Sequence, residues 1–235
     1  PVPHYHAGAW NPENDIAFVL DHLHIQKDTR ILDLGAGVCW TTRDLASRSD
    51  HVLAVDIMDD KFLGLESGDT YIRATGRFFD RVNSVMELLP FRDNRFDVIL
   101  TNCSAHHAED LSRLFTEIRR VLKPGGAYVI CNELTQGLFK KSELVGNDHY
   151  YTIQDYLRNL TAVGFKPQIF FPRSIHETLM NGALKRKSGK WQNVGKIASR
   201  MYKKLWLQKV IHRNTFFLSE LLGLPPIIIS YPKKI

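Results

Sequence analysis

The chain has 235 residues, with 31 Lys and Arg against 25 Asp and Glu and a formal net charge of +6 at pH 7. Its 44% hydrophobic and 24% charged residues are typical of a globular protein, which excludes disorder, collagen and coiled coil as the main content. The sequence has neither the roughly 18 to 20 uninterrupted apolar residues of a spanning helix nor an N-terminal signal pattern. We therefore expect a cytoplasmic protein. It opens on Pro1 rather than Met, which is compatible with trimming or processing of an N-terminal segment.

Apolar runs of strand length alternate with stretches of helix length, a pattern that predicts βαβ units and a doubly wound, mainly parallel α/β sheet. Strands are expected at residues 30–34, 51–55, 96–101 and 127–131, and helices at 14–23, 41–47 and 111–122. Pro124-Gly125-Gly126 is expected to end the last of these helices and to turn the chain. A further helix at 152–163, capped by Thr152 and stopped by Gly164, precedes strands at 166–171 and 225–231.

The basic residues are concentrated in one segment. Residues 178–219 contain ten Lys and Arg and no Asp or Glu, whereas the rest of the chain is slightly acidic. This segment falls between the last two predicted strands, where a connection is normally short. Residues 178–224 are therefore predicted to be a helical insertion before the last strand.

A glycine loop, Asp33-Leu34-Gly35-Ala36-Gly37, lies between the first predicted strand and the helix after it. Its glycines let the backbone turn sharply and pass close to a ligand. Asp56 ends the next strand, where a carboxylate can accept hydrogen bonds from both ribose hydroxyls of an adenosine cofactor. The loop lacks the third glycine of a dinucleotide-binding loop, since Cys39 and Trp40 stand at that point, which favours a cofactor without a pyrophosphate.

Four segments together resemble the core of the class I S-adenosylmethionine-dependent methyltransferases: ILDLGAG, VLAVDI, MELLPFRDNRFDVILTN and IRRVLKPGGAYVI. The resemblance covers roughly residues 28–133. It implies a Rossmann-like, seven-stranded sheet with helices on both faces, a single methyltransferase domain over residues 1–235, and a cofactor-binding core at 28–133.

The same resemblance implies roles for single residues. Asp33, Gly35, Ala36 and Gly37 would surround the methionine portion of S-adenosylmethionine, Asp56 would hold its ribose, and Ile57 would contact its adenine. Val85 stands where relatives often have an acid for the adenine amino group, which leaves backbone groups of Val85 and Met86 to contact the adenine edge. Asn102 is expected to border the cofactor.

Candidate catalytic residues follow the strand that ends at Asn102. Because methyl transfer is an in-line displacement, placement of the acceptor supplies most of the acceleration, and a base is needed only if the acceptor must lose a proton. His106 and His107 lie in this loop and titrate near neutrality, so either is a candidate base, with packing or hydrogen bonding as the alternative role.

Two other segments face the same region in this fold. Asn132-Glu133 follows the next strand, and residues 147–151 either line the acceptor side or cap a helix. The three cysteines, Cys39, Cys103 and Cys131, have no C-x-x-C spacing and are expected to be buried and reduced. No metal site is predicted.

In the basic insertion, Val194, Ile197, Ala198, Met201 and Leu205 recur at helical spacing among lysines and arginines. The pattern fits a solvated face of a lid helix, a surface for an anionic lipid or a lipid-linked substrate, or phosphate contacts to RNA through residues 185–213.

The leading hypothesis is an S-adenosylmethionine-dependent enzyme that methylates an oxygen or nitrogen of a small molecule, such as a sugar or a secondary metabolite, with the insertion covering the acceptor side. The alternatives are an RNA methyltransferase and a catalytically idle binding module. The sequence predicts neither the acceptor nor the oligomeric state.

Overall fold

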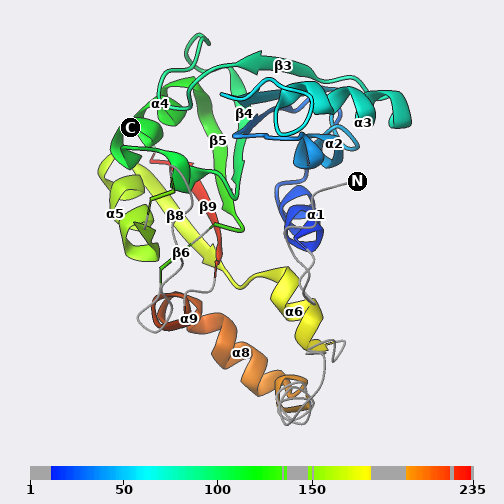
Figure 1. Ribbon diagram of the computed structural model, residues 1–235. Helices are drawn as coiled ribbons and strands as arrows, with labels where there is room; N and C mark the ends of the chain where they lie inside the picture. The colour runs from blue at the N-terminus through cyan, green and yellow to red at the C-terminus, as the bar shows by residue number, and fades with distance from the viewer. Residues whose placement is uncertain are drawn as a thin grey trace.

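The computed structural model describes residues 12–133, 135–136, 148–149, 151–180, 200–222 and 225–233. A seven-stranded sheet in the order β3-β2-β1-β4-β5-β9-β8 forms its centre (Figure 1). The strands are β1 (Arg30–Leu34), β2 (His51–Asp56), β3 (Asp80–Asn83), β4 (Phe96–Asn102), β5 (Leu122–Cys131), β8 (Phe165–Phe170) and β9 (Ile227–Pro232). Only β9 runs antiparallel to its neighbours β5 and β8. This arrangement confirms the predicted doubly wound, mainly parallel sheet.

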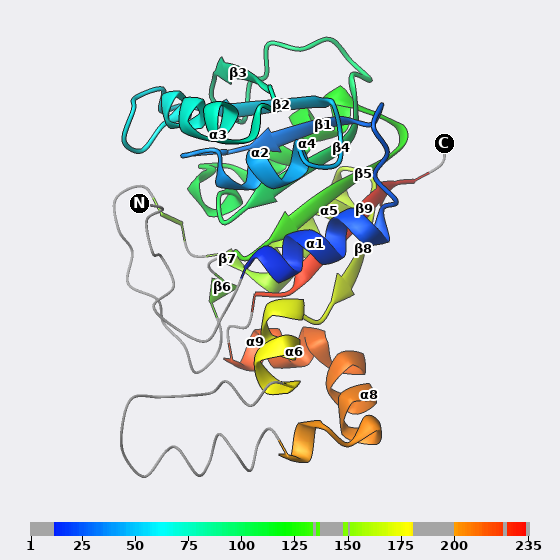
Figure 2. The same cartoon turned by 90° about the vertical axis from the view of Figure 1, so that its right-hand side faces the viewer.

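Helices cover both faces of the sheet, as Figure 2 shows. The helices of the α/β core are α1 (Glu13–His22), α2 (Trp40–Leu45), α3 (Gly68–Thr75), α4 (Leu111–Val121) and α5 (Ile153–Ala162), with 3-10 turns η1 (Leu65–Ser67) and η2 (Ala105–His107). Alternate residues of a strand point to opposite faces. Leu32 therefore joins the core under α4 and α5, whereas Ile31 joins the core under α1 and α2.

The predicted ends of α5 and the predicted start of α4 are confirmed. Thr152 and Asp155 form a reciprocal capping box at the start of α5, and Gly164, at φ +88°, follows its end. Asp110 caps α4 by accepting hydrogen bonds from the backbone N–H groups of Ser112 and Arg113. These caps satisfy backbone donors that a helix start leaves unpaired.

The prediction for Pro124-Gly125-Gly126 is confirmed only in part: Gly125 has a positive φ, of +79°, but α4 already ends at Val121. These residues lie within β5, which begins directly after α4 at Leu122. The pairing with β4 shifts between Phe96 and Val98, so the extra residues form an irregularity of the ladder. Gly126 permits this irregularity because it has no Cβ. A Cβ there would stand 2.7 Å from the Asp97 carbonyl oxygen.

Between β8 and β9 the described chain forms α6 (Arg173–Met180), a helical turn at residues 200–202, α8 (Leu205–Arg213) and α9 (Thr215–Leu222). Residues 181–199 and 223–224 of the predicted insertion lie outside the described residues. The amphipathic helix predicted to continue through Leu205 is interrupted, because Lys203 and Lys204 form a bend and Lys204 has extended backbone angles. No helix in the described part of the chain combines the length and hydropathy of a membrane span.

The short strands β6 (Thr135–Gln136) and β7 (Tyr151–Thr152) pair in parallel beyond the carboxyl end of β5. Their pairing brings the segment before α5 back to the edge of the main sheet where β1, β4 and β5 end. The polar residues described next gather at this edge.

Candidate functional site

The glycine loop joins β1 to α2 and is tied to the end of β2. The backbone N–H groups of Gly35 and Ala36 both donate to the Val55 carbonyl oxygen, at 2.8 and 3.0 Å. Gly37 donates its N–H to Asp56 Oδ2 at 2.7 Å. Gly35 and Gly37 have φ of +75° and +48°, in the left-handed region that glycine adopts without a steric penalty. The loop is therefore held in one shape by the strand that presents Asp56.

The two glycines are needed for different reasons. Within the described ranges, a Cβ on Gly37 would meet only the Leu63 carbonyl oxygen, at an ordinary contact distance of 3.8 Å, so this side of the loop is uncrowded. A Cβ on Gly35 would lie 2.4 Å from Ser104 Cβ. Ser104 in turn donates its hydroxyl to the Leu34 carbonyl oxygen at 2.8 Å. The close approach predicted for Gly35 is therefore to the loop after β4, and Gly37 is the glycine on the uncrowded side.

Gly35→Ala is expected to lower the free energy of unfolding by about 3 kcal/mol, because left-handed strain adds to overpacking against Ser104. Gly76→Ala is the matched control: Gly76 also has a positive φ, of +68°, but no atom of the described part of the chain lies within 4 Å of its Cβ position. It should cost only about 1 kcal/mol. Urea unfolding of both variants measures the difference, and equal losses would show that Ser104 does not restrict Gly35.

Asp56 lies at the centre of the candidate cofactor site. Its Oδ2 accepts from Gly37 and its Oδ1 accepts from the Met58 N–H at 2.9 Å. A carboxylate offers about four acceptor positions, so each oxygen keeps one for a further donor. The predicted ribose contact fits this arrangement, since two adjacent hydroxyls need two acceptors.

Apolar side chains flank Asp56 and are open to solvent. Ile57 is 67% exposed and Val85 is 43% exposed, and they follow the adjacent strands β2 and β3. Met86 is half-buried, and its Cε would lie 3.5 Å from a Cβ on Gly35. Exposed apolar groups beside a partly satisfied carboxylate fit a flat heterocycle attached to a ribose, so Ile57, Val85 and Met86 stay candidates for adenine contact.

Asp33, at the start of the glycine loop, is held by a hydrogen bond from α2. Its side chain is buried, and its Oδ2 accepts from the Thr42 hydroxyl at 2.6 Å. Burial, together with the nearby charges of Asp56 and Asp44, raises the pKa of Asp33 to about 7. In this structure Asp33 lies beneath the loop and links it to α2, rather than on the uncrowded side that Gly37 faces.

Asn102 belongs to a chain of side chains at the ends of β4 and β5. Its Nδ2 donates to the Thr41 hydroxyl at 2.9 Å, and its Oδ1 accepts from Asn132 Nδ2 at 2.7 Å. The Oδ1 of Asn132 is buried and has no hydrogen-bond partner among the residues that the structure describes. An unpaired buried acceptor is costly, so this oxygen is suited to a donor on a ligand such as an ammonium group.

The residues present therefore fit S-adenosylmethionine. Asp56 has acceptor capacity for the ribose, exposed Ile57 and Val85 fit the adenine, and Asn132 offers an acceptor to the methionine ammonium. The sequence predicts Asn132 at this edge of the sheet. It does not predict the unpaired oxygen, which depends on how the side chains of neighbouring strands meet.

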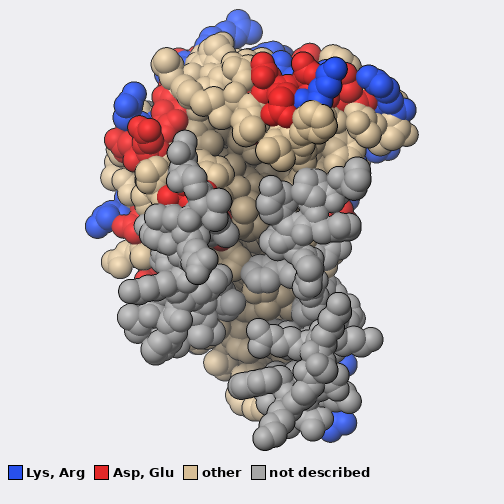
Figure 3. All heavy atoms as spheres, viewed as in Figure 1, with Lys and Arg blue, Asp and Glu red and all other residues tan. Residues whose placement is uncertain are grey.

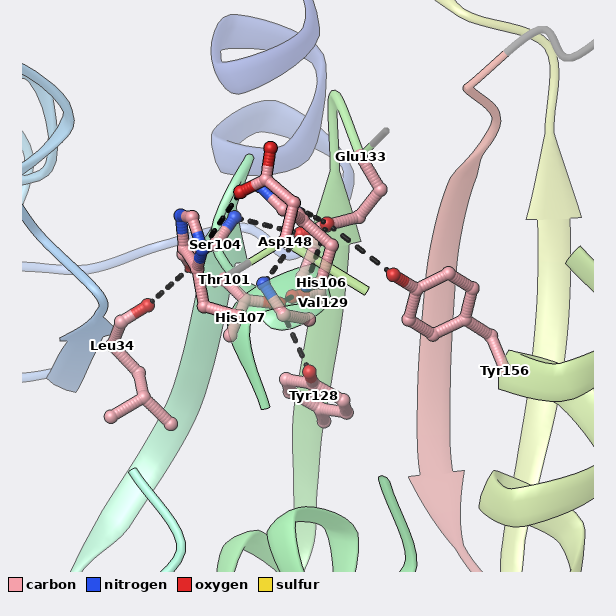
Figure 4. A network of polar contacts seen from close by, with 11 residues as sticks. Leu34, Thr101, Ser104, His106, His107, Tyr128, Val129, Glu133, Asp148 and Tyr156 are labelled. Carbon is pink, nitrogen blue, oxygen red and sulfur yellow. Dashed lines mark hydrogen bonds and ion pairs between the residues drawn. The ribbon is translucent and has the colours of Figure 1, made fainter. Parts of the chain in front are cut away.

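Glu133 and His106 form a buried pair next to this site (Figure 4). His106 Nδ1 lies 2.8 Å from Glu133 Oε2. The same carboxylate accepts backbone N–H groups from Ser104 at 3.0 Å, Ala105 at 2.9 Å and His106 at 3.2 Å. One carboxylate from the end of β5 thus shapes the whole loop after β4 and orients the imidazole.

The electrostatics of the pair favour its charged form. Burial disfavours imidazolium, but the hydrogen bond and charge of Glu133, with a smaller contribution from Asp148, outweigh it and raise the pKa of His106. Burial likewise opposes the charge of Glu133, yet its hydrogen bond from His106 and those from backbone N–H groups lower its pKa. The carboxylate fixes Nδ1 as the protonated nitrogen and leaves Nε2 directed toward Asp148.

Asp148 and His107 complete the cluster. Asp148 Oδ1 lies 3.2 Å from His107 Nδ1 and 3.6 Å from His106 Nε2. The His149 N–H donates to the His106 carbonyl oxygen at 2.9 Å, which places residues 148–149 on the histidine loop. Burial, followed by the charge of His106, lowers the pKa of His107, whose side chain is about half exposed. Asn147 and Tyr150 of the predicted segment lie outside the described residues.

His106, His107 and Asp148 also have ligand atoms within 4.8 Å of one another, so within the described ranges they could hold a metal ion. The absence of a metal site stays a prediction. Cys39 and Cys131 are buried, as expected, and Cys103 is half-buried. Burial raises the pKa of Cys39 and of Cys103 to about 12, which suits inert thiols rather than nucleophiles.

Sequence reasoning located Glu133 and residues 147–151 near the pocket but did not pair them with His106. The signal for the first pairing is positional, because Glu133 and His106 follow β5 and β4, which are adjacent in the sheet. Tyr156, whose hydroxyl lies 3.5 Å from Glu133 Oε2, was not foreseen, because it comes from the middle of α5.

Comparison with known proteins agrees with this geometry. Residues 32–130 match the family model of a methyltransferase domain. The chain is 32% identical over 151 residues to a glycine/sarcosine/dimethylglycine N-methyltransferase of Actinopolyspora halophila, covering 59% of this chain and 26% of that protein. It is 34% identical over 102 residues to a demethylmenaquinone methyltransferase of Clavibacter sepedonicus, covering 43% of this chain and 40% of that protein.

Among solved structures, geranyl diphosphate C-methyltransferase from Streptomyces coelicolor superposes with a TM-score of 0.62 at 18% identity, covering 93% of this chain and 78% of that one. That structure contains Mg²⁺, geranyl diphosphate and S-adenosyl-L-homocysteine. The [4+2]-cyclase SpnF has a TM-score of 0.58 at 17% identity, covering 94% of this chain and 80% of that one. At these identities the likeness shows the fold, and a fold alone does not define a reaction.

The fold and the loop at its carboxyl edge define a methyltransferase-like α/β domain. Residues 32–130 match the model of a methyltransferase domain, and this match is consistent with the predicted class I S-adenosylmethionine-dependent methyltransferase family. It spans 26% and 40% of the length of the two curated relatives described above.

Proposed function

We propose that this chain transfers a methyl group from S-adenosylmethionine to an oxygen or nitrogen of a small molecule. The bound cofactor would supply an electrophilic methyl group. The curated relatives are named for very different acceptors, an amino acid series and a quinone precursor, so their names do not select one here. The reaction type rests on the family, and the choice of acceptor atom rests on the residues beside the cofactor loop.

The observation that carries the proposal is the Glu133–His106 pair. With Nδ1 held by Glu133, His106 can take a proton only at Nε2, toward Asp148. A hydroxyl or a protonated amine must lose a proton to react, and a base in place supplies about 100-fold or more. His107, more exposed and with a lowered pKa, is the second candidate base.

Other residues of the chain would bind the cofactor and orient the acceptor. Asp56 and the loop from Gly35 to Gly37 would hold the ribose and the methionine portion, as the cofactor-binding core at residues 28–133. We infer that the helices between β8 and β9 cover the acceptor side. In support, α9 lies next to β6 in Figure 1, and its Glu220 accepts the Gln154 N–H at 2.9 Å at the start of α5.

Replacing His106 with Asn tests the base. Release of S-adenosylhomocysteine is measured over a panel of hydroxyl- and amine-bearing small molecules, and kcat is expected to fall about 100-fold. The affinity for S-adenosylmethionine should stay within about twofold, because the proposal assigns His106 to the acceptor and not to the cofactor. Since the pKa of His106 is raised, kcat of the unaltered protein should climb as pH rises through a range above 6.5, and the variant should lose this dependence.

His51→Asn, at the exposed start of β2 and the opposite end of the strands, is the control and should leave kcat unchanged. An unchanged kcat in His106→Asn would assign His106 to loop structure alone. Absence of product with every acceptor, despite cofactor binding, would favour the idle module over the enzyme.

A further inference from the structure

The helix α8 presents large apolar side chains to solvent. Leu205 is 75% exposed, Trp206 62% and Val210 48%, and Phe217 of α9 is 61% exposed. Single exposed apolar residues are common, but Trp206 and Val210 are one helical turn apart and share a face. The half-buried residues Leu207 and Ile211 occupy the other side of α8, so the exposed set is not its packing face.

Basic side chains are interleaved with this apolar set. Lys209 and Arg213 are exposed on the same side of α8 as Trp206, because Lys209 lies three residues after Trp206 and Arg213 four residues after Lys209. Lys203 and Lys204 precede the helix. No salt bridge within the described ranges involves any of these four cations. The described surface at the lower end of Figure 3, where Figure 1 draws α8, shows Lys and Arg without Asp or Glu.

We propose that this α8 face, consisting of Leu205, Trp206, Lys209, Val210 and Arg213, binds the surface of an anionic phospholipid bilayer. At a bilayer interface, apolar side chains enter the acyl boundary while Lys and Arg remain among the anionic headgroups. Trp favours this zone because its ring is apolar and its N–H is polar. An anionic bilayer would therefore contact the apolar and the basic side chains of the α8 face at the same time.

RNA would contact mainly the basic side chains of the α8 face. Phosphates would pair with Lys209 and Arg213, but Leu205 and Val210 would gain nothing from a charged backbone, and stacking of bases needs aromatic platforms. Trp206 is the single aromatic residue of α8. The exposed aliphatic area therefore favours lipid over RNA. None of these residues belongs to the cofactor or histidine sites, so the inference concerns the solvent-exposed face of α8 and does not depend on which acceptor is methylated.

Sedimentation with vesicles tests the proposal. The purified full chain is mixed with vesicles of phosphatidylcholine alone or with one quarter phosphatidylglycerol, and it is expected to bind the anionic vesicles at least tenfold more tightly. Trp206→Ser with Val210→Ser removes apolar contacts, and Lys209→Glu with Arg213→Glu reverses the charges. Each pair is expected to lower affinity at least tenfold.

Arg77→Glu with Phe78→Ser is the matched control, because both residues are exposed just beyond α3 and Phe78 is 66% exposed. It should bind like the unaltered chain, and affinity for S-adenosylmethionine should be the same in all variants, which shows that they fold. Equal binding to both vesicle types, equal loss in the control, or salt-sensitive binding to single-stranded RNA without vesicle binding would each overturn the proposal.

Discussion

Replacing Asp56 with Ala is expected to weaken the binding of S-adenosylmethionine and of S-adenosylhomocysteine by about 100-fold. The two carboxylate positions left free by Gly37 and Met58 would accept the two ribose hydroxyls. Hydrogen bonds to a charged group contribute about 1.5 kcal/mol or more each, and about 1.4 kcal/mol corresponds to a factor of ten in affinity. Calorimetric titration of both ligands measures the loss directly.

Asp59→Asn is the control for this experiment. Asp59 is exposed in the same loop, and its backbone carbonyl, rather than its side chain, accepts a hydrogen bond from Glu66. It should bind both ligands like the unaltered chain. The affinity of Asp56→Asn for both ligands should lie between that of Asp56→Ala and that of the control, since Asn keeps one acceptor oxygen. If the unaltered chain bound neither ligand, the idle-module alternative would replace the enzyme.

The central strands were predictable because they are buried on both faces and therefore read as continuous apolar runs. β3 was not assigned from its own residues; the resemblance alone implied a seventh strand. Asp80–Asn83 is a partly exposed edge strand without an apolar run. The bend at Lys203 and Lys204 was missed for a related reason, because apolar spacing continues through Leu205 although the helix does not.

The proximity of the glycine loop to Asp56 was predictable from the sequence. Gly37 and Asp56 follow neighbouring strands, and local spacing is enough to bring them together. The role predicted for Asp33 stays a prediction; spacing alone did not show that its side chain is buried and accepts from the Thr42 hydroxyl. The pairing of His106 with Asp148 required knowledge of where a segment 42 positions later returns to the sheet. Side-chain networks that join distant segments depend on tertiary packing, which periodicity does not encode.

Glu133→Ala is expected to lower the free energy of unfolding by about 4 kcal/mol. The substitution leaves the backbone N–H groups of Ser104, Ala105 and His106 without their acceptor, and it leaves the His106 imidazole buried without its carboxylate. Removing one partner of a buried charged pair is typically worth about 3 to 5 kcal/mol. Urea unfolding measures the loss. Glu109→Ala, exposed on the same loop, is the control and should stay within about 0.5 kcal/mol of the unaltered chain.

The pH dependence of this difference distinguishes the charged pair from simple packing. The lowered pKa of Glu133 adds stability that is present above the ordinary value of 4.5 and is lost as pH falls through the lowered pKa. The raised pKa of His106 adds stability that is present below 6.5 and is lost as pH rises through the raised pKa. The gap between the unaltered chain and Glu133→Ala should therefore be widest between pH 4.5 and 6.5 and narrow on both sides. A gap that does not change with pH would assign the effect of Glu133 to its backbone hydrogen bonds alone.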